Sequence, residues 1–369
     1  MASLRDRLKR INEVNKDKPQ ASLENKDEII DLINLGFKPS GHKVYKKNVI
    51  LKTLIKTEES LPNAVKILIP DLNKSKLPEV KDFIFFDLET TGLSGGAGTV
   101  AFLASFGRII QPENQSENYC LLHITQYLLL DYPGENDFLL NVLSEFNNKS
   151  SVIVSYNGKC FDSQILKTRC LMNRIKPPLY NHVDLLHPAR RLWKNIIDNC
   201  SQASIESQIL NIQRKDDIPG SLAPVIWFDF LKTGKTEMLV KICDHNIYDI
   251  SGLASILAAM ISIAEDPLRP DTIRFDLERF ALNWRKYLYI FKDKIKSDNE
   301  LFISGKKLLC LAAERNHPRA VYIYAYDLIK DGNYKEAYKY VKKGLTLFDK
   351  DSQWHEKLLR RKERLEKKL

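Results

Sequence analysis

The sequence lacks the features that mark membrane, secreted and zinc-binding proteins. The uncharged apolar stretch at residues 250–264 is shorter than the roughly 20 residues that span a bilayer and predicts a buried helix. The start, MASLRDRLKRINEV, is charged from Arg5 and has no apolar segment typical of a signal peptide. The six cysteines form no CxxC pair and no zinc-ligand spacing, as is typical of free thiols in a reducing compartment. We therefore expect a cytoplasmic protein without a membrane partner.

The chain does have length and positive charge. Its 369 residues are 44% hydrophobic and 28% charged, which suits a soluble globular protein of two or three domains. This composition excludes a wholly disordered chain, a collagen-like chain and a polytopic membrane protein. Lys and Arg number 57 against 47 Asp and Glu, a net charge of +10. Such an excess suits a polyanion partner such as nucleic acid, although many basic proteins bind none.

Residues 1–80 predict a small helical and hairpin appendage without catalytic residues. Leu4, Leu8 and Ile11 recur at helical spacing, and residues 28–35 predict another short helix. The following stretch, GFKPSGHKVYKKNVILKT, has turn residues between short apolar runs and predicts a hairpin.

Residues 81–268 predict an α/β domain. Three apolar runs (KDFIFFDLE, AFLASFGRII, YCLLHITQYLLL) predict strands, and NDFLLNVLSEF predicts a helix. A strand (SVIVSYNG), a helix (FDSQILKTRCLM) and a short strand (HVDLL) follow. This order favours a mixed five-stranded sheet flanked by helices. Residues 190–265 predict mostly helix, broken by the loop RKDDIPGSLAP and ending in a long helix from about Glu237 to Glu265.

Residues 269–369 predict an all-α region. The stretch HPRAVYIYAYDLIKDGNYKEAYKYVKKGLTLF predicts two helices with a turn at residues 332–333, and it resembles one tetratricopeptide (TPR) repeat. The residues that match this pattern best are Gly332, Tyr334, Ala337 and Leu345. Val321 departs from it, because the pattern has Trp there. One repeat cannot bury its face alone, so we expect degenerate neighbours, and such a tail is a surface for a protein partner. The basic end, HEKLLRRKERLEKKL, is interpreted as a solvated helix in preference to a nucleic-acid contact.

Two carboxylates stand two residues apart in FFDLETTGL. Alternation along a strand puts Asp87 and Glu89 on one face and Leu88 on the other. Two acids on one face of an apolar strand repel each other and are costly to bury unpaired, so a cation is expected between them. Oxygen ligands at this spacing suit Mg²⁺ or Mn²⁺. The alternative is a solvent-exposed strand end followed by a simple turn.

The second motif is SYNGKCFD, in which a strand ends at Asn157–Gly158 and a helix begins near Phe161–Asp162. A glycine at this strand end would let a ligand approach the backbone. Asp162 is either a ligand or a first-turn carboxylate that favours the helix start. Asp184, at the end of the strand in HVDLL, is interpreted as a cap in preference to a ligand.

The third motif, CDHNIYDISGL, carries His245 and Asp249 four residues apart on one helix face. An imidazole one turn from a metal-binding carboxylate can take a proton from a water held by that metal. The alternative is an ordinary surface pair. Tyr248 lies about a quarter-turn from Asp249 and is expected to point away from it.

Together, these motifs resemble those of the DEDD-type 3′–5′ exonucleases, which have the ribonuclease H-like fold. The stretch from DLETTGLSGGAGTVAFLASFG through YNGKCFD, HVDLLHPARRLW, SIESQILNIQRKDDIPG and HNIYDISGL is similar to the YprB-type ribonuclease H-like family. Members of that family often carry a TPR-like tail. The resemblance covers roughly residues 80–265.

The resemblance implies a nuclease that releases nucleotides from a free 3′ end of DNA or RNA. It implies four acids as ligands of two divalent cations, Mg²⁺ or Mn²⁺: Asp87, Glu89, Asp162 and Asp249. The base departs from the family pattern. The histidine of the His-type enzymes stands five residues before the last aspartate, where this chain has Asp244. The tyrosine of the Tyr-type enzymes stands four before it, where this chain has His245, and same-face geometry favours His245 as the base.

Residues beside the acids are expected to bind substrate: Thr90, Gly92, Leu93, Asn157, Gly158, Lys159 and Phe161. The glycine-rich stretch 95–98 either lines the terminal nucleotide or is a flexible loop, and without GKT or GKS it is no P-loop. Four basic residues either track the phosphate backbone or are ordinary surface charges: Lys159, Arg169, Arg190 and Arg191. Two other functions stay open, namely a nucleic-acid-binding scaffold whose tail recruits a partner and an endonuclease of the same fold.

Overall fold

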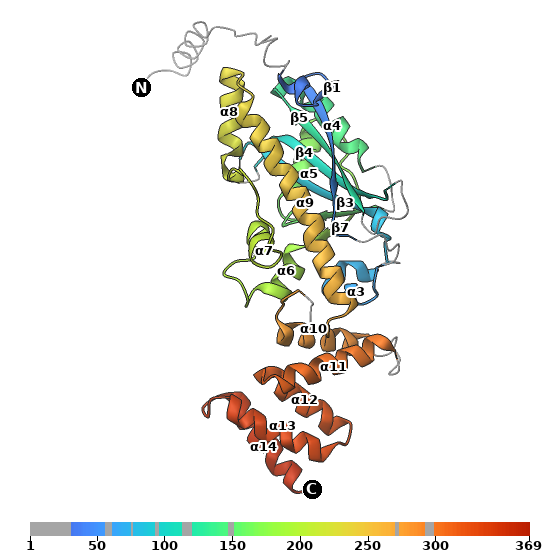
Figure 1. The fold of residues 1–369 in the computed structure, drawn as a ribbon, viewed down its shortest axis with the longest axis vertical. Coiled ribbons are helices and arrows are strands. Elements are labelled where there is room, and N and C mark those ends of the chain that lie inside the picture. The colour runs from blue at the N-terminus through green and yellow to red at the C-terminus, as the bar shows by residue number, and fades with distance from the viewer. Residues whose placement is uncertain are drawn as a thin grey trace, which may run out of the picture.

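A seven-stranded mixed sheet lies in the upper half of the molecule in Figure 1, in the order β1-β2-β5-β4-β3-β6-β7. The computed structural model describes residues 31–55, 61–74, 77–92, 96–112, 120–146, 151–269, 273–291 and 299–369. The strands are β1 (Lys38–Gly41), β2 (Val44–Lys52), β3 (Phe83–Thr90), β4 (Ala101–Ile110), β5 (Leu121–Leu129), β6 (Val152–Ser155) and β7 (Asn181–Asp184). β3 pairs antiparallel with β4 and parallel with β6, which pairs parallel with β7. The mixed α/β sheet is confirmed, with two strands more than the five expected.

The two additional strands come from the hairpin predicted within residues 36–53. β1 pairs with β2, and β2 pairs antiparallel with β5 from Val44 opposite Leu129 to Lys52 opposite Leu121. The hairpin is therefore part of the central sheet, and the expectation of an appendage was wrong for these strands. An unpaired β5 would present a row of free backbone N–H and C=O groups, which β2 satisfies. The helical spacing of Leu4, Leu8 and Ile11 lies outside the described residues.

Alternation along β3 divides the core into two layers. Phe83 and Phe85 belong to one buried cluster, whereas Ile84, Phe86 and Leu88 belong to the other. The helices of the domain are α3 (Val65–Leu68), α4 (Glu135–Ser144), α5 (Asp162–Met172), α6 (Leu186–Trp193), α7 (Gln202–Gln208), α8 (Ala223–Thr233) and α9 (Glu237–Glu265). Short 3-10 turns are η1 (Pro70–Lys74), η2 (Val80–Asp82), η3 (Tyr132–Gly134) and η4 (Gly220–Leu222). The period of two puts Asp87 and Glu89 on the same face as Phe83 and Phe85.

Helix α9 lies against β3, β4 and β5 and also contacts α3, α7 and α8 (Figure 1). Its bounds agree with the helix predicted from about Glu237 to Glu265. By length and composition alone it could cross a membrane, but 61% of its most apolar window is buried inside the protein, as in a core helix. Helix α9 is therefore apolar because the sheet and neighbouring helices cover it.

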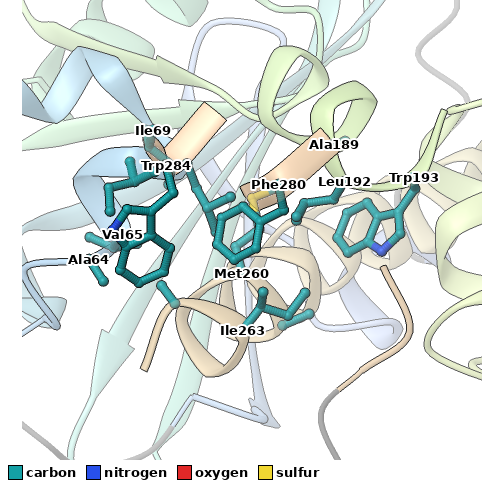
Figure 2. Packing of buried hydrophobic residues seen from close by; sticks show 14 of the residues in the cluster. Ala64, Val65, Ile69, Ala189, Leu192, Trp193, Met260, Ile263, Phe280 and Trp284 are labelled. Carbon is teal, nitrogen blue, oxygen red and sulfur yellow. The ribbon is translucent and has the colours of Figure 1, made fainter. Parts of the chain in front are cut away.

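The C-terminal region is helical, with each helix packed on the next: α10 (Leu277–Ile290), α11 (Glu300–Glu314), α12 (Pro318–Lys330), α13 (Tyr334–Leu347) and α14 (Gln353–Glu366). The predicted helix pair is α12 and α13, and Gly332 between them has φ +77°, which favours glycine. Helix α10 joins the main core. Figure 2 shows Phe280 and Trp284 of α10 among Val65, Leu192 and Met260. Apolar packing is thus continuous across residue 268, where we expected a domain boundary.

Candidate functional site

Four carboxylates converge where β3, α5 and α9 meet. Strand β3 carries Asp87 and Glu89, Asp162 is the first residue of α5, and Asp249 lies in the middle of α9. Glu89 and Asp162 are only 9% and 5% exposed. Burial, followed by the charges of Asp249, Asp162 and Glu89, raises the pKa of Asp87 well above its ordinary value. These acids are therefore close enough to repel one another strongly.

The pKa values of the other three acids are also raised above their ordinary values. Burial, and then the charges of Asp249 and Asp162, raise the pKa of Glu89. Burial raises the pKa of Asp162 to about 7, and it also raises that of Asp249, although His245 and Arg214 act against this. Without a cation, the cluster holds more negative charge than its surroundings neutralise. Desolvated carboxylate oxygens are the donors that a hard divalent cation prefers.

A cation position is also indicated by geometry. One ligand atom each from Glu89, His245 and Asp249 lie within 4.8 Å of one another. These three residues come from β3 and α9, which are packed together. The two carboxylates of this group fit a divalent metal ion, and the imidazole lies beside that position. His245 lies at this position as the same-face argument expected, with its Nε2 3.3 Å from Asp249 Oδ2.

A buried polar chain holds Asp87. Asn246, which is fully buried, donates from Nδ2 to Asp87 Oδ2 at 2.6 Å. The Ser105 hydroxyl and Gln126 Nε2 both donate to the Asn246 side-chain oxygen. Because that oxygen is occupied by two donors, the amide nitrogen has to face Asp87. The core thus directs a hydrogen-bond donor at one of the four acids.

A second network surrounds Asp249. The Arg214 guanidinium binds both oxygens of Glu206 at 2.7 and 2.8 Å, and donates to Asp249 Oδ1 at 2.8 Å and to Asp217 Oδ2 at 3.3 Å. Glu206 is 2% exposed, and it lies where α7 crosses α9. A Cβ added at Gly252 would lie 1.8 Å from Glu206 Oε1, so only glycine leaves room for this carboxylate. The fork geometry of arginine fixes the orientation of Asp249.

His245 and Tyr248 differ in direction. The His245 ring lies between two carboxylates, with Nδ1 2.7 Å from Asp217 Oδ1 and Nε2 toward Asp249. The Tyr248 hydroxyl instead donates to the Lys215 carbonyl at 3.2 Å, outside the acid cluster. The histidine, and not the tyrosine, therefore faces the acids.

The loop before α5 is built around Asp184. Its carboxylate accepts hydrogen bonds from the backbone N–H groups of Asn157, Lys159 and Leu186 at 2.8, 3.2 and 3.1 Å. Asp184 thus acts as the cap that we expected. A Cβ at Gly158 would lie 2.4 Å from Ser155 Oγ and 2.9 Å from Asp162 Oδ2, so the chain's own atoms already require glycine there.

The residues expected to bind substrate have different environments. Asn157 is exposed, Gly92 is half-buried, and the buried Thr90 donates its hydroxyl to the Gly92 carbonyl at 2.9 Å. Phe161 packs against the apolar core, and Lys159 Nζ pairs with Asp71 Oδ2 at 2.5 Å. Leu93 lies outside the described residues, as does part of the glycine-rich stretch. Two of these residues adjoin the acids directly: Thr90 follows Glu89 on β3, and Gly158 lies beside Asp162.

Arg169 and Arg191, two of the four basic residues considered as phosphate contacts, donate hydrogen bonds to acceptors of the protein itself. Arg169 is 9% exposed and binds both oxygens of Glu135 at 2.5 Å, while also donating to the Ala97 carbonyl at 2.7 Å. It ties α4 and α5 to the segment before β4, so its guanidinium is occupied by acceptors of the protein and is not an ordinary surface charge. Arg191 donates to the Leu68 carbonyl at 2.8 Å. Arg190 is exposed.

Four residues of these networks were missed in the sequence: Glu206, Arg214, Asp217 and Asn246. Glu206, Arg214 and Asp217 stand in SIESQILNIQRKDDIPG, which was noted for its similarity to the family without a role for any of its residues. Asn246 stands next to His245, and its side chain leaves the helix toward the sheet. The available signal was the position of an amide one residue after the histidine, on a helix face that is otherwise apolar.

Comparison with known proteins finds similarity over about half of the chain. The family model described as RNase_H superfamily matches residues 84–261. "Uncharacterized protein YprB" of Bacillus subtilis (strain 168) is 38% identical over 182 residues, which cover 48% of this chain and 42% of that protein. The match therefore spans less than half the length of this relative.

Solved structures of E. coli Exonuclease I show a weaker likeness. The complex with a dT13 oligonucleotide is 18% identical, covers 43% of this chain and 42% of that chain, and has a TM-score of 0.27. The complex with a 5cy-dT13 oligonucleotide is 14% identical, covers 57% and 43%, and has a TM-score of 0.31. Because both TM-scores are far below 0.5, the assignment rests on the family model and on YprB. Residues 84–261 are therefore similar to the ribonuclease H superfamily, and the identity to YprB supports a YprB-type ribonuclease H-like family.

Proposed function

We propose that the protein is a metal-dependent 3′–5′ exonuclease that hydrolyses phosphodiester bonds of single-stranded DNA or RNA. The observation that carries this proposal is the convergence of four acids whose pKa values are raised by burial and by one another. Such a cluster has no structural benefit without a cation, because like charges in a buried site destabilise the fold. The match of residues 84–261 to the RNase_H superfamily model supports the proposal of a nuclease.

The proposed ligands of two divalent cations, Mg²⁺ or Mn²⁺, are the four acids: Asp87, Glu89, Asp162 and Asp249. When bound, such ions orient and activate water and stabilise the leaving 3′ oxygen. Asn246 holds one oxygen of Asp87, and Arg214 holds one oxygen of Asp249, so each acid keeps its other oxygen for the site. His245 is the proposed general base, with Nε2 on the side of the acids and able to accept a proton.

The other proposed roles concern the substrate and the tail. The residues proposed to contact the terminal nucleotide stand near the acids in the sequence: Thr90, Gly92, Leu93, Asn157, Gly158, Lys159 and Phe161. The α10–α14 region is proposed to be TPR-like and to present a surface to a protein partner. The product would be a nucleoside 5′-monophosphate.

The direct test is a cleavage assay on matched single-stranded DNA and RNA oligonucleotides, labelled at the 5′ end, with Mn²⁺. A ladder of stepwise shorter products supports the exonuclease. Internal cuts from the first time point would indicate an endonuclease of the same fold. Binding without cutting would indicate a scaffold. The Asp87→Asn variant shows whether any activity belongs to this site or to a contaminating nuclease.

A further inference from the structure

We propose that Asp217 is a positioning residue that fixes the tautomer and the direction of the His245 imidazole. This inference rests on the proposed nuclease function, in which His245 is the base. Asp217 lies in the loop between α7 and η4, and its Oδ1 is 2.7 Å from His245 Nδ1. Their side chains are 18% and 13% exposed, so the contact is largely shielded from water.

Each nitrogen of the His245 imidazole faces a carboxylate, so the ring proton can lie on Nδ1 or on Nε2. Asp217 contacts Nδ1 at 2.7 Å, whereas Asp249 lies 3.3 Å from Nε2. A carboxylate is an acceptor only, so the ring nitrogen that faces it closely has to donate. The shorter contact puts the proton on Nδ1 and leaves the lone pair of Nε2 toward the acid cluster. Without Asp217, Asp249 would draw the proton to Nε2, and the ring could no longer accept one there.

The Asp217 carboxylate is itself held in place. Its Oδ1 accepts the Ile218 backbone N–H at 2.9 Å, and its Oδ2 accepts from Arg214 at 3.3 Å. Burial alone would raise the pKa of Asp217, but the hydrogen bonds from His245 and Arg214 lower it, so the group stays ionised. An ionised Asp217 also stabilises the imidazolium that forms when Nε2 takes a proton from water. That proton afterwards returns to solvent, and the ring is neutral again.

The anchor of this loop is Arg214, whose guanidinium is bound to both Glu206 and Asp249. Contacts therefore run from His245 to Asp217, from Asp217 to Arg214, and from Arg214 back to Asp249 on the helix that carries His245. This closed set of contacts fixes the ring relative to the acid on the next turn. A surface ion pair would have no such fixed geometry.

Asp217→Ala tests the proposal, because it removes the acceptor that faces Nδ1. Without that acceptor, Asp249 is the carboxylate left to the ring, and the proton moves to Nε2. We expect kcat in the Mn²⁺ assay to fall by about 10²- to 10⁴-fold, the range for loss of a general base, with KM for the oligonucleotide unchanged. We also expect long-range ¹H–¹⁵N spectra of metal-free protein to show the His245 ring in the other tautomer. Asp216→Ala is the matched control, because Asp216 is exposed in the same loop and should leave both readouts unchanged.

Three results would overturn the proposal. The first is wild-type kcat in Asp217→Ala, and the second is an unchanged His245 tautomer in that variant. The third is a further loss of rate when Asp217→Ala is added to His245→Ala, because a residue that acts through His245 has no effect once the ring is gone. If the wild-type protein cleaves no oligonucleotide, the proposed function fails by itself. The spectra then decide alone whether Asp217 sets the tautomer.

Discussion

Asn246 donates a hydrogen bond of 2.6 Å to Asp87 across 159 residues of sequence, from the centre of α9 to the sheet face below it. The amide cannot turn around, because the Ser105 hydroxyl and Gln126 already donate to its oxygen. The contact therefore supplies a donor of fixed direction to a carboxylate that burial would otherwise keep protonated. A donor of this kind favours the ionised acid, which is the form that binds a cation.

Replacing this donor should weaken metal binding. For Asn246→Leu, we expect the Mn²⁺ concentration at half-maximal activity to rise about 10- to 100-fold, because loss of an outer partner of a ligand has effects of this size. Calorimetric titration of the metal-free protein with Mn²⁺ provides the binding readout without cleavage. Asn173→Leu is the control, because Asn173 binds Glu135 away from the acids. Equal Mn²⁺ affinities in wild type and Asn246→Leu would contradict the role of this contact.

Removing one of the mutually repelling acids should abolish cleavage and at the same time stabilise the metal-free protein. Asp87→Asn is expected to abolish cleavage and to raise the melting temperature of the protein in EDTA, since burial and the neighbouring acids oppose the charge of Asp87. Thermal unfolding in EDTA and an end-labelled cleavage assay measure the two effects. Near-wild-type turnover in this variant would refute the proposed metal site.

The metal-free protein should also depend on pH through Asp162. Its pKa in the folded protein is about 7, mainly because of burial, against 3.8 for the free side chain. A raised pKa means that the stability present below about pH 4 is lost as the pH rises to about 7. The gain in melting temperature from Asp162→Asn in EDTA should therefore be larger at pH 8 than at pH 5. A gain independent of pH would show that Asp162 is not perturbed in this way.

Truncation tests the continuity of the core at residue 268. A chain ending at residue 269 lacks α10, so Leu192 and Met260 lose the cover of Phe280. We expect this chain to aggregate or to bind a hydrophobic dye, whereas a chain ending at residue 315 keeps α10 and α11 and should be more soluble. In the full chain, Phe280→Ala should cost about 3–5 kcal/mol of unfolding free energy, as for other buried aromatic residues. A monomeric, stable 1–269 fragment would instead support independent domains.

The sequence predicted the helices and strands better than it predicted which strands pair and which side chains meet. Period-two spacing was enough to put Asp87 and Glu89 on one strand face, and i, i+4 spacing was enough to put His245 beside Asp249. It was not enough to show that the hairpin of β1 and β2 joins β5, because strand pairing over some 80 residues depends on which edge is left free. Arg169 shows the same limit: a basic residue on a helix reads as surface charge until Glu135 is placed beside it. Asp217 and Arg214 likewise acquire their roles only when the loop folds back onto α9.

The tight space at Gly252 means that the proposed activity can be lost in a relative of this chain without any change in the four acids. A methyl group at this position would displace Glu206, and with it the arginine that orients Asp249. A relative that retains the four acids and the histidine but has any side chain at the equivalent of Gly252 is thus expected to cleave poorly. The residue at this buried position therefore predicts, from sequence alone, which relatives cleave poorly, although it is not one of the proposed metal or substrate contacts.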